Sequence, residues 1–180
     1  MPNVWTYPSD KNLSAFEPNR VLLNCGNLQF IDAHYVSGGG SEGAGRAAMV
    51  ADVNDDLQPD LLVRQVGGGP LKVYLNRFPP TSRLVISLRG TKSNSMGIGA
   101  RVVCEVSGRR LERQLYANNS VFAQQGARVR FGLGDAKRVE RLTVHWPSGG
   151  TTVLEDVAVD RHLLIREGSS EPTVLRSVTR

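Results

Sequence analysis

The sequence has few of the residues that metal sites and disulfide frameworks need. Its 180 residues include two cysteines, Cys25 and Cys104, and neither a Cys-x-x-Cys pair nor a four-ligand zinc spacing can be drawn from them. A structural zinc site is therefore excluded. A disulfide between the two cysteines depends on their distance in the fold, and the alternative of two free thiols stays open.

Long apolar runs are also lacking. No stretch approaches the roughly 20 consecutive apolar residues of a transmembrane helix, so we expect no membrane span. The N-terminus, from Met1 to Tyr7, has neither a basic start nor an apolar run, and we expect no signal peptide in it. If the protein is exported, we expect its signal to lie upstream of this sequence.

The sequence offers little material for catalysis. It has three histidines, and each of them fits a structural role in or next to a strand better than a role as an acid or base. Ser148 stands in Pro-Ser-Gly-Gly, which lacks the Gly-x-Ser-x-Gly pattern of a hydrolase nucleophile. We therefore expect that the protein is not an enzyme.

Positive charge is in excess, but it is not clustered in the sequence. The formal net charge is +5 and the pI is about 9.6, values that nucleic-acid-binding proteins often have. The basic residues are spread along the whole chain, with acidic residues between them at 105–112 and 138–141. Such mixed segments are typical of solvated strand faces. We expect no nucleic-acid partner.

Short apolar runs separated by Gly, Asn, Pro and Asp make up most of the chain. No segment of ten residues shows a capped 3.6-residue period, so the pattern predicts strands rather than helices. Adjacent prolines at 79 and 80 interrupt strand pairing and indicate a domain boundary. The chain is polar after residue 167 and predicts a frayed tail or linker there. The predicted strands are 21–23, 29–33, 47–51, 61–65, 72–75, 83–88, 100–106, 109–116, 128–131, 141–145 and 162–166.

An acidic loop runs from residue 52 to residue 60. Oxygen-bearing side chains fall at its first, third, fifth and ninth positions, which are Asp52, Asn54, Asp56 and Asp60. This spacing indicates calcium, because a tightly turning loop points alternate side chains inward and calcium takes about 6 to 8 oxygen ligands. The carbonyl of Gln58 and water would complete the shell. The alternative is an Asx-rich turn whose carboxylates cap backbone amides without a metal.

The residues around this loop carry a family resemblance. The stretch 45–54, Gly-Arg-Ala-Ala-Met-Val-Ala-Asp-Val-Asn, continues through 59–63 to 71–76 and resembles an FG-GAP or VCBS-type repeat. The resemblance implies blades of an integrin-like β-propeller, and segment 19–32 resembles the closing hairpin of a preceding blade. That family usually has glycine at the fourth and sixth loop positions, where this sequence has Asp55 and Leu57. A calcium loop commonly needs φ > 0 at its sixth residue, and holding Leu57 there costs on the order of 1 to 3 kcal/mol.

Residues 84–166 resemble the ASPIC/UnbV domain, which follows such repeats in exported proteins. The resemblance is carried by Gly-Thr-Lys-Ser-Asn at 90–94 leading to Gly-Ile-Gly-Ala-Arg-Val at 97–102, Ser-Val-Phe-Ala-Gln-Gln at 120–125, Phe-Gly-Leu-Gly at 131–134 and Val-His-Trp-Pro-Ser-Gly at 144–149. The glycines of these motifs permit tight turns, so the motifs indicate mainly architecture. The family usually has histidine before Phe-Gly-Leu-Gly, where this sequence has Arg130. The functional alternative is a shared surface for a partner or glycan, formed by Asn94, Arg101, Gln124 and Trp146.

Together, these patterns predict an all-β chain in which one or more partial β-propeller blades are followed by a compact β-sandwich or barrel. One and a half blades cannot close a propeller, so we expect an oligomer, a larger complex or packing onto the second domain to cover them. The expected segments are an N-terminal segment at 1–18, FG-GAP/VCBS-like partial blades at 19–80, an ASPIC/UnbV-like domain at 83–167 and a tail at 168–180.

The expected function is that of a non-enzymatic, calcium-assisted binding or adhesion module, extracellular or periplasmic, that contacts a protein or a glycan. One alternative is a structural subunit that docks in a larger assembly. Another is an accessory domain of a larger exported enzyme.

Overall fold

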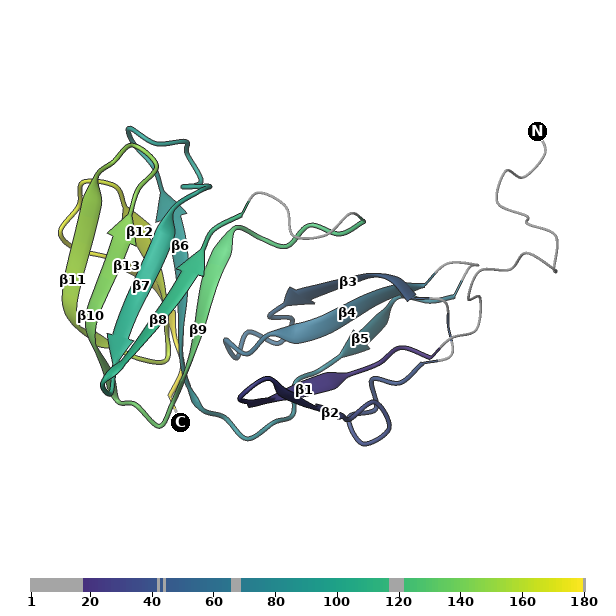
Figure 1. Cartoon of the computed structure of the whole chain (residues 1–180). Helices are drawn as coiled ribbons and strands as arrows, with labels where there is room; N and C mark the ends of the chain where they lie inside the picture. Colours follow the sequence, from purple (N-terminus) through teal and green to yellow (C-terminus); the bar gives the residue numbers. More distant parts are fainter. Residues whose placement is uncertain (1–17, 42, 44, 66–68, 117–121, 180) are drawn as a thin grey trace, which may run out of the picture. The chain divides into compact units, whose positions relative to one another are not determined.

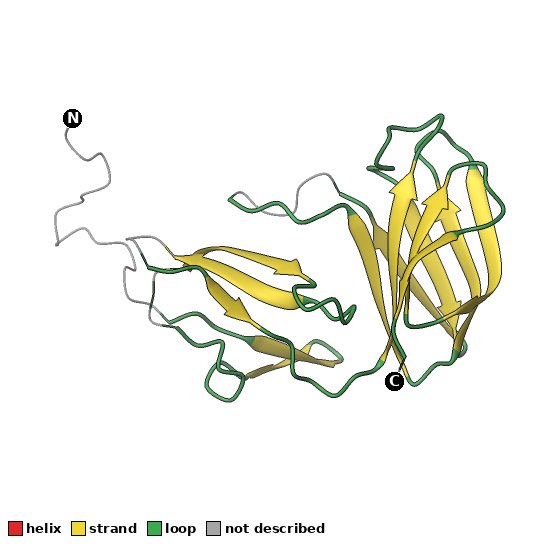
Figure 2. Ribbon diagram, turned by 180° about the vertical axis from the view of Figure 1, so that it is seen from behind, coloured by secondary structure: helices red, strands yellow, loops and turns green. Residues whose placement is uncertain are grey.

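The computed structural model describes residues 18–41, 43, 45–65, 69–116 and 122–179, and these residues form strands and loops (Figure 2). The all-β prediction is confirmed. In the described part of the chain, no helix is long and apolar enough to cross a membrane. The predicted N-terminal segment lies outside the described residues except for its last position. The strands are β1 Leu22–Gly26, β2 Gln29–Asp32, β3 Gly45–Ala51, β4 Asp60–Gln65, β5 Lys72–Tyr74, β6 Ser82–Arg89, β7 Arg101–Val106, β8 Arg109–Gln114, β9 Arg128–Gly134, β10 Arg138–His145, β11 Thr151–Ala158, β12 Arg161–Arg166 and β13 Thr173–Ser177.

The chain divides into two compact units, and the acidic loop belongs to the second. The first unit comprises Met1–Met49 and Leu61–Tyr74, and the second comprises Val50–Asp60 and Leu75–Arg180. Loop residues 52–59 therefore join the C-terminal strands, although β3 and β4 lead into and out of the loop. The predicted segment boundaries did not separate the loop from its repeat in this way.

The first unit contains two small sheets. Strands β1 and β2 form a hairpin, and β3, β4 and β5 form a three-stranded sheet in that order. The unit buries few large apolar side chains, because residues such as Leu22, Phe30 and Ile31 are 60%, 56% and 59% exposed. Within the described residues, neither a propeller nor a closed barrel is present. The first unit thus has little core of its own.

The second unit contains two four-stranded sheets, ordered β11-β10-β7-β8 and β13-β12-β6-β9, which face each other across one core (Figure 1). Side chains alternate between the two faces of a strand, so every second residue points inward. In β6 the inward residues are Leu84, Ile86 and Leu88, and all three are buried. The other core residues include Val102, Cys104, Val106, Phe131, Leu142, Val144, Leu163 and Ile165.

Strand β6 is central to the second sheet, where it pairs antiparallel with β9 and parallel with β12. Because its apolar positions face the core, the alternate positions Arg83, Val85 and Ser87 lie on the opposite face. The strand thus contributes to the core and to an outer surface at once.

Two strands of the structure were absent from the sequence prediction. Strand β11 was missed because polar Thr, Glu and Asp residues interrupt its apolar pattern, and Asp156 has a positive φ of 53°. Strand β13 lies in the segment predicted as a frayed tail, and that prediction was wrong for Thr173–Ser177. This edge strand has few buried side chains and is held by pairing with β12. Edge strands of this kind carry little apolar signal.

A buried carboxylate explains one of the C-terminal sequence motifs. The backbone amides of Thr91, Lys92 and Ser93 donate to Oε2 of Glu167 at 2.8, 2.8 and 2.7 Å, and Ser148 donates to its Oε1. Although burial by itself raises the pKa of Glu167, these hydrogen bonds outweigh it and hold the pKa far below its usual range. The motif at 90–94 is therefore a turn wrapped around Glu167, a residue that the sequence analysis did not single out.

The two cysteines are both free thiols. Cys25 is exposed in the first unit, whereas Cys104 is buried in the core of the second. Burial, together with the negative charges of Glu140 and Glu105, raises the pKa of Cys104 to about 11. The open question of a disulfide is thereby answered in favour of separate thiols.

Candidate functional site

The acidic loop is held together by its own carboxylates. The two side-chain oxygens of Asp52 accept hydrogen bonds from the amides of Asp56 and Leu57, both at 3.0 Å. Asp60 is fully buried, and its oxygens accept from the amides of Val53 and Asn76, both at 2.8 Å. These bonds satisfy backbone donors that the loop would otherwise leave without partners.

The remaining predicted ligands are engaged in the same network. Asn54 donates its amide to Asp56 Oδ2 at 2.9 Å, and the backbone amide of Gln58 donates to Asp56 Oδ1 at 2.6 Å. Burial by itself raises the pKa of Asp56, but these hydrogen bonds and the charge of Arg83 outweigh it and lower that pKa. The structure thus brings all five predicted ligands into one loop, with their carboxylates capping backbone amides.

Two loop positions have a left-handed backbone. Asp55 has φ of 64° and Leu57 has φ of 66°, so the positive φ expected at the sixth position is present. The Leu57 side chain is only 3% exposed, and its burial offsets the strain. The loop therefore keeps its turn without the glycines.

The loop already has a cationic partner within the second unit. The Arg176 guanidinium forms an ion pair with Asp55 and lies 3.7 Å from Asp52 Oδ2. In the described part of the chain, no three acidic, histidine or cysteine side chains converge as a metal site. Asp52, Asp56 and Asp60 cap backbone amides, and an arginine lies beside Asp52 and Asp55, so a calcium ion would have to share these oxygens with the donors already on them. Calcium binding by the loop stays a prediction.

Arg176 is one of five residues that form a basic face, defined here as Arg83, Arg128, Arg130, His162 and Arg176. Strand register aligns Arg176 with His162 across β13 and β12, His162 with Val85 across β12 and β6, and Val85 with Arg130 across β6 and β9. Arg83 and Arg128 are two residues away on β6 and β9, on the same side.

This face corrects the expectation that the basic residues form no cluster. The sequence separates the arginines widely, but period-two alternation and the pairing of distant strands bring four of them to one surface. The signal available in the sequence was local: Arg128 and Arg130 alternate with the core residues Val129 and Phe131.

Two of these arginines have buried donors without partners. The Nε atoms of Arg83 and Arg130 are buried and have no hydrogen-bond partner among the described residues. Burial, followed by the positive charge of Arg128, lowers the pKa of Arg130. A buried donor left without an acceptor costs about 1 to 3 kcal/mol. An acceptor for either donor would remove this cost.

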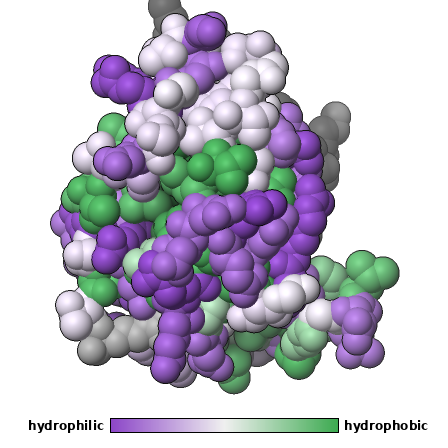
Figure 3. Space-filling view, turned by 90° about the vertical axis from the view of Figure 1, so that its left-hand side faces the viewer, coloured by the Kyte–Doolittle hydropathy of each residue, from purple (hydrophilic) through white to green (hydrophobic). Residues whose placement is uncertain are grey.

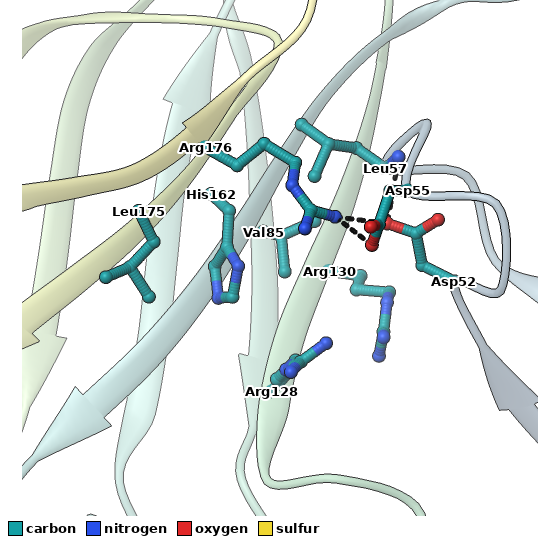
Figure 4. A pocket seen from close by; sticks show the side chains of 9 residues that line it. All are labelled: Asp52, Asp55, Leu57, Val85, Arg128, Arg130, His162, Leu175 and Arg176. Carbon is teal, nitrogen blue, oxygen red and sulfur yellow. Dashed lines mark hydrogen bonds and ion pairs between the residues drawn. The ribbon is translucent and has the colours of Figure 1, made fainter.

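A cavity of about 220 Å³ opens between the basic face and the acidic loop (Figure 4). We call it the acid pocket. Figure 4 shows Arg176 directed at Asp52 and Asp55, while Arg128 and Arg130 approach from β9. The pocket is lined by Asp52, Asp55, Leu57, Val85, Arg128, Arg130, His162, Leu175 and Arg176.

A second cavity, of about 500 Å³, shares Leu57, Val85 and Arg130 with the acid pocket. We call it the apolar groove. Arg83 is its other charged residue, and most of its wall is apolar. Its apolar lining residues are Leu57, Pro59, Phe78, Pro79, Leu84, Val85 and Phe131, of which Leu84 and Phe131 belong to the core.

His162 lies in the acid pocket as a neutral side chain. Its Nε2 is hydrogen-bonded to Ser87 Oγ at 2.9 Å. Burial lowers its pKa most, the charges of Arg128, Arg130 and Arg176 lower it further, and Asp52 opposes them. The positive charge of the pocket therefore comes from its arginines at neutral pH.

The predicted partner-surface residues have other roles in the structure. Trp146 is 4% exposed and donates its indole N–H to Thr152 at 2.9 Å, so it belongs to the core rather than to a surface. Asn94 closes the turn to Ile98 with two hydrogen bonds of 2.8 Å. Arg101 pairs with Glu112 at 3.0 Å. Gln124 is exposed, and its role in partner binding stays a prediction.

The surface on the side of β11 differs from the acid pocket. Figure 3 shows this side of the molecule with hydrophobic side chains in patches between hydrophilic ones. Arginines here are paired, since Arg138 contacts Asp156 and Arg141 contacts Glu155. They provide matched controls for Arg128 and Arg130 of the basic face.

Comparison with known proteins identifies the domain that carries much of this site. The family model of ASPIC and UnbV matches residues 90–172, so the chain contains an ASPIC/UnbV domain there, as the sequence analysis predicted. Arg128, Arg130 and His162 lie inside the match, whereas Arg83, Arg176 and the acidic loop lie outside it. The resemblance of the N-terminal half to FG-GAP/VCBS repeats stays a prediction. No curated protein matches the chain.

Proposed function

We propose that the chain is a non-enzymatic, extracellular or periplasmic binding module whose basic face contacts an acidic protein or glycan. The observation that carries the proposal is the pair of buried Nε donors on Arg83 and Arg130, which have no partner among the described residues. Guanidinium groups bind carboxylates, sulfates and phosphates through paired donors, and the interaction is stronger where water is excluded.

The charged groups of the pocket suit binding better than catalysis. Arginine stays protonated near neutral pH, so it can hold an anion but cannot relay protons. His162 has a lowered pKa and is hydrogen-bonded to Ser87. The proposal therefore assigns the pocket to recognition.

Retention on immobilised polyglutamate and on heparin tests this proposal. The variant Arg128→Gln/Arg130→Gln is compared with Arg138→Gln/Arg141→Gln, which removes the same charge from β10, where both arginines are paired. We expect the first variant to bind at least tenfold more weakly and to lose much of the salt dependence, while the control stays close to the parent protein. Equal binding by both variants, or no retention of the parent on either matrix, contradicts the proposal.

Calcium assistance is a separate proposal, supported by the ligand spacing and the left-handed turn at Asp55 and Leu57. A site filled at 100 times its dissociation constant would stabilise the protein by about 2.7 kcal/mol. Melting is measured in millimolar calcium and in chelator, for the parent and for Asp52→Ala. Equal melting temperatures for the parent in the two buffers reject calcium assistance and leave the basic-face proposal intact.

A structural role in a larger assembly is the second candidate function. Its support is the exposed apolar surface of the first unit, including Leu71 and Val73 at 54% and 46% exposure. This surface suits partial propeller blades that need neighbours to cover them. Sedimentation across a hundredfold concentration range tests self-assembly, and a monomer throughout rejects the version that relies on copies of this chain. The role of an accessory domain in a larger exported enzyme is a further proposal, which the encoding gene would test.

A further inference from the structure

The geometry points to a more specific ligand: a peptide segment of a partner protein that places an acidic side chain in the acid pocket and a large apolar side chain in the apolar groove. This inference rests on the proposed function and names the partner of the same site. It follows from the junction of two cavities with different chemistry at Leu57, Val85 and Arg130.

The acid pocket already accommodates a carboxylate from a polypeptide. Asp55 of the acidic loop is paired with Arg176, so one guanidinium of the pocket already binds a carboxylate of this chain. Arg128 and Arg130 also line the pocket, and the buried Nε of Arg130 has no partner among the described residues. The volume of about 220 Å³ equals roughly seven water molecules, enough for a carboxylate and the methylenes that carry it.

The apolar groove favours a peptide over a glycan. Most of its lining residues are Leu, Pro, Val and Phe, and one of them, Phe78, is 58% exposed. Sugar hydroxyls would lose hydrogen bonds to water in such a groove, whereas a Phe or Leu side chain gains from leaving water. Arg83 adds a donor with a buried Nε for a peptide carbonyl.

The acidic loop acts as an internal competitor in this scheme. Asp55 neutralises part of the positive charge at Arg176, so an incoming carboxylate meets both an occupied guanidinium and a like charge. Replacing Asp55 with Asn removes the competing charge and keeps a residue that tolerates positive φ. The Asp55→Asn protein is therefore expected to bind acidic peptides more tightly than the parent.

The experiment is calorimetric titration with acetylated peptides that contain one Glu and one Phe separated by one, two or three Gly residues. Matched peptides replace Glu with Gln or Phe with Ala, and a heparin hexasaccharide serves as the glycan probe. For the best spacing, we expect each replacement in the peptide to weaken binding at least fivefold. Arg130→Gln is expected to weaken it at least tenfold, and Asp55→Asn to strengthen it three- to tenfold.

Phe78→Ala separates the groove from the pocket. We expect it to weaken the Glu/Phe peptide but to leave the Glu/Ala peptide unchanged, and Arg138→Gln to affect neither. Binding of the hexasaccharide through Arg130 without binding of any peptide overturns this inference while the proposed function stands. Binding of neither probe overturns both. The two-cavity arrangement is overturned if replacing Phe with Ala in the peptide leaves its affinity unchanged, or if Asp55→Asn leaves the affinity unchanged.

Discussion

Replacing Leu57 with glycine sets two effects of known size against each other. Leu57 has a left-handed backbone, with φ of 66°, which glycine adopts without strain. Its side chain is also 3% exposed, so glycine would leave the space beneath the loop empty. Which effect dominates decides whether the loop is strained or well packed.

The packing effect is the larger. Relief of left-handed strain contributes about 1 to 2 kcal/mol of stability. Truncating a buried leucine costs about 2 to 5 kcal/mol, and the greater freedom of an unfolded glycine costs a further 0.5 to 1 kcal/mol or so. The central values predict that Leu57→Gly destabilises the second unit by about 3 kcal/mol.

Asp55→Gly is the matched control, because Asp55 also has positive φ but is exposed. It loses a surface ion pair worth about 0.5 kcal/mol and relieves some backbone strain, so we expect a change within about 1 kcal/mol of zero.

Urea unfolding followed by the fluorescence of Trp146 measures both variants. A Trp5→Phe background leaves Trp146 as the sole tryptophan, and its burial in the core makes it a reporter of the second unit. A Leu57→Gly protein as stable as the parent would refute the reasoning, because strain would then outweigh burial.

Three further predictions concern titratable groups. In native protein at pH 8, iodoacetamide is expected to modify Cys25 and spare Cys104, whose pKa burial raises to about 11, and mass spectrometry before and after denaturation checks this. Because its pKa is lowered in the folded protein, His162 is held there in its neutral form. Its contribution to stability is therefore present above the unfolded pKa of about 6.5 and is lost as pH falls below it. We expect His162→Gln to make the melting temperature less dependent on pH between about pH 7 and 5. Glu167 has a strongly lowered pKa in the folded protein, so its contribution to folding stability is present above about pH 4.3 and is lost as pH falls toward the folded pKa. We expect Glu167→Gln to lower the melting temperature at pH 7 by several degrees. An unchanged melting temperature would contradict the role given to this carboxylate.

The sequence was most informative where alternation is clear. The apolar residues of β6 and β7 fill every inward position after Ser82, with only Val85 and Val103 added on the outer face, and both strands were predicted within one or two residues of their observed ends. β13 was missed because an edge strand is specified by hydrogen bonding to its neighbour more than by its own apolar residues. The acidic loop was found from its spacing, whereas the positions of its oxygens depend on backbone amides that spacing alone does not place.

The basic face was beyond prediction from one sequence for a physical reason. Asp55 and Arg176 are 121 residues apart, and the pairing of β13 with β12 and of β12 with β6 places Arg176 on the face that Asp55 contacts. Three local departures from the resembled families were nevertheless visible. Asp55, Leu57 and Arg130 each replace the residue usual in those families, and all three line the acid pocket.

Because β6 pairs with β12, which is far away in the sequence, the second sheet cannot be completed until β12 has been synthesised. The 71 residues at 90–160 separate the two strands, so β6 has an open edge until they have been synthesised. At about 5 to 20 residues per second, this interval lasts roughly 4 to 14 s. During it, Leu84 and Ile86 lack the core neighbours Leu163 and Ile165 supplied by β12. An open strand edge of this kind is a site for aggregation until β12 emerges, and premature termination before β12 would leave β6 paired on one side only.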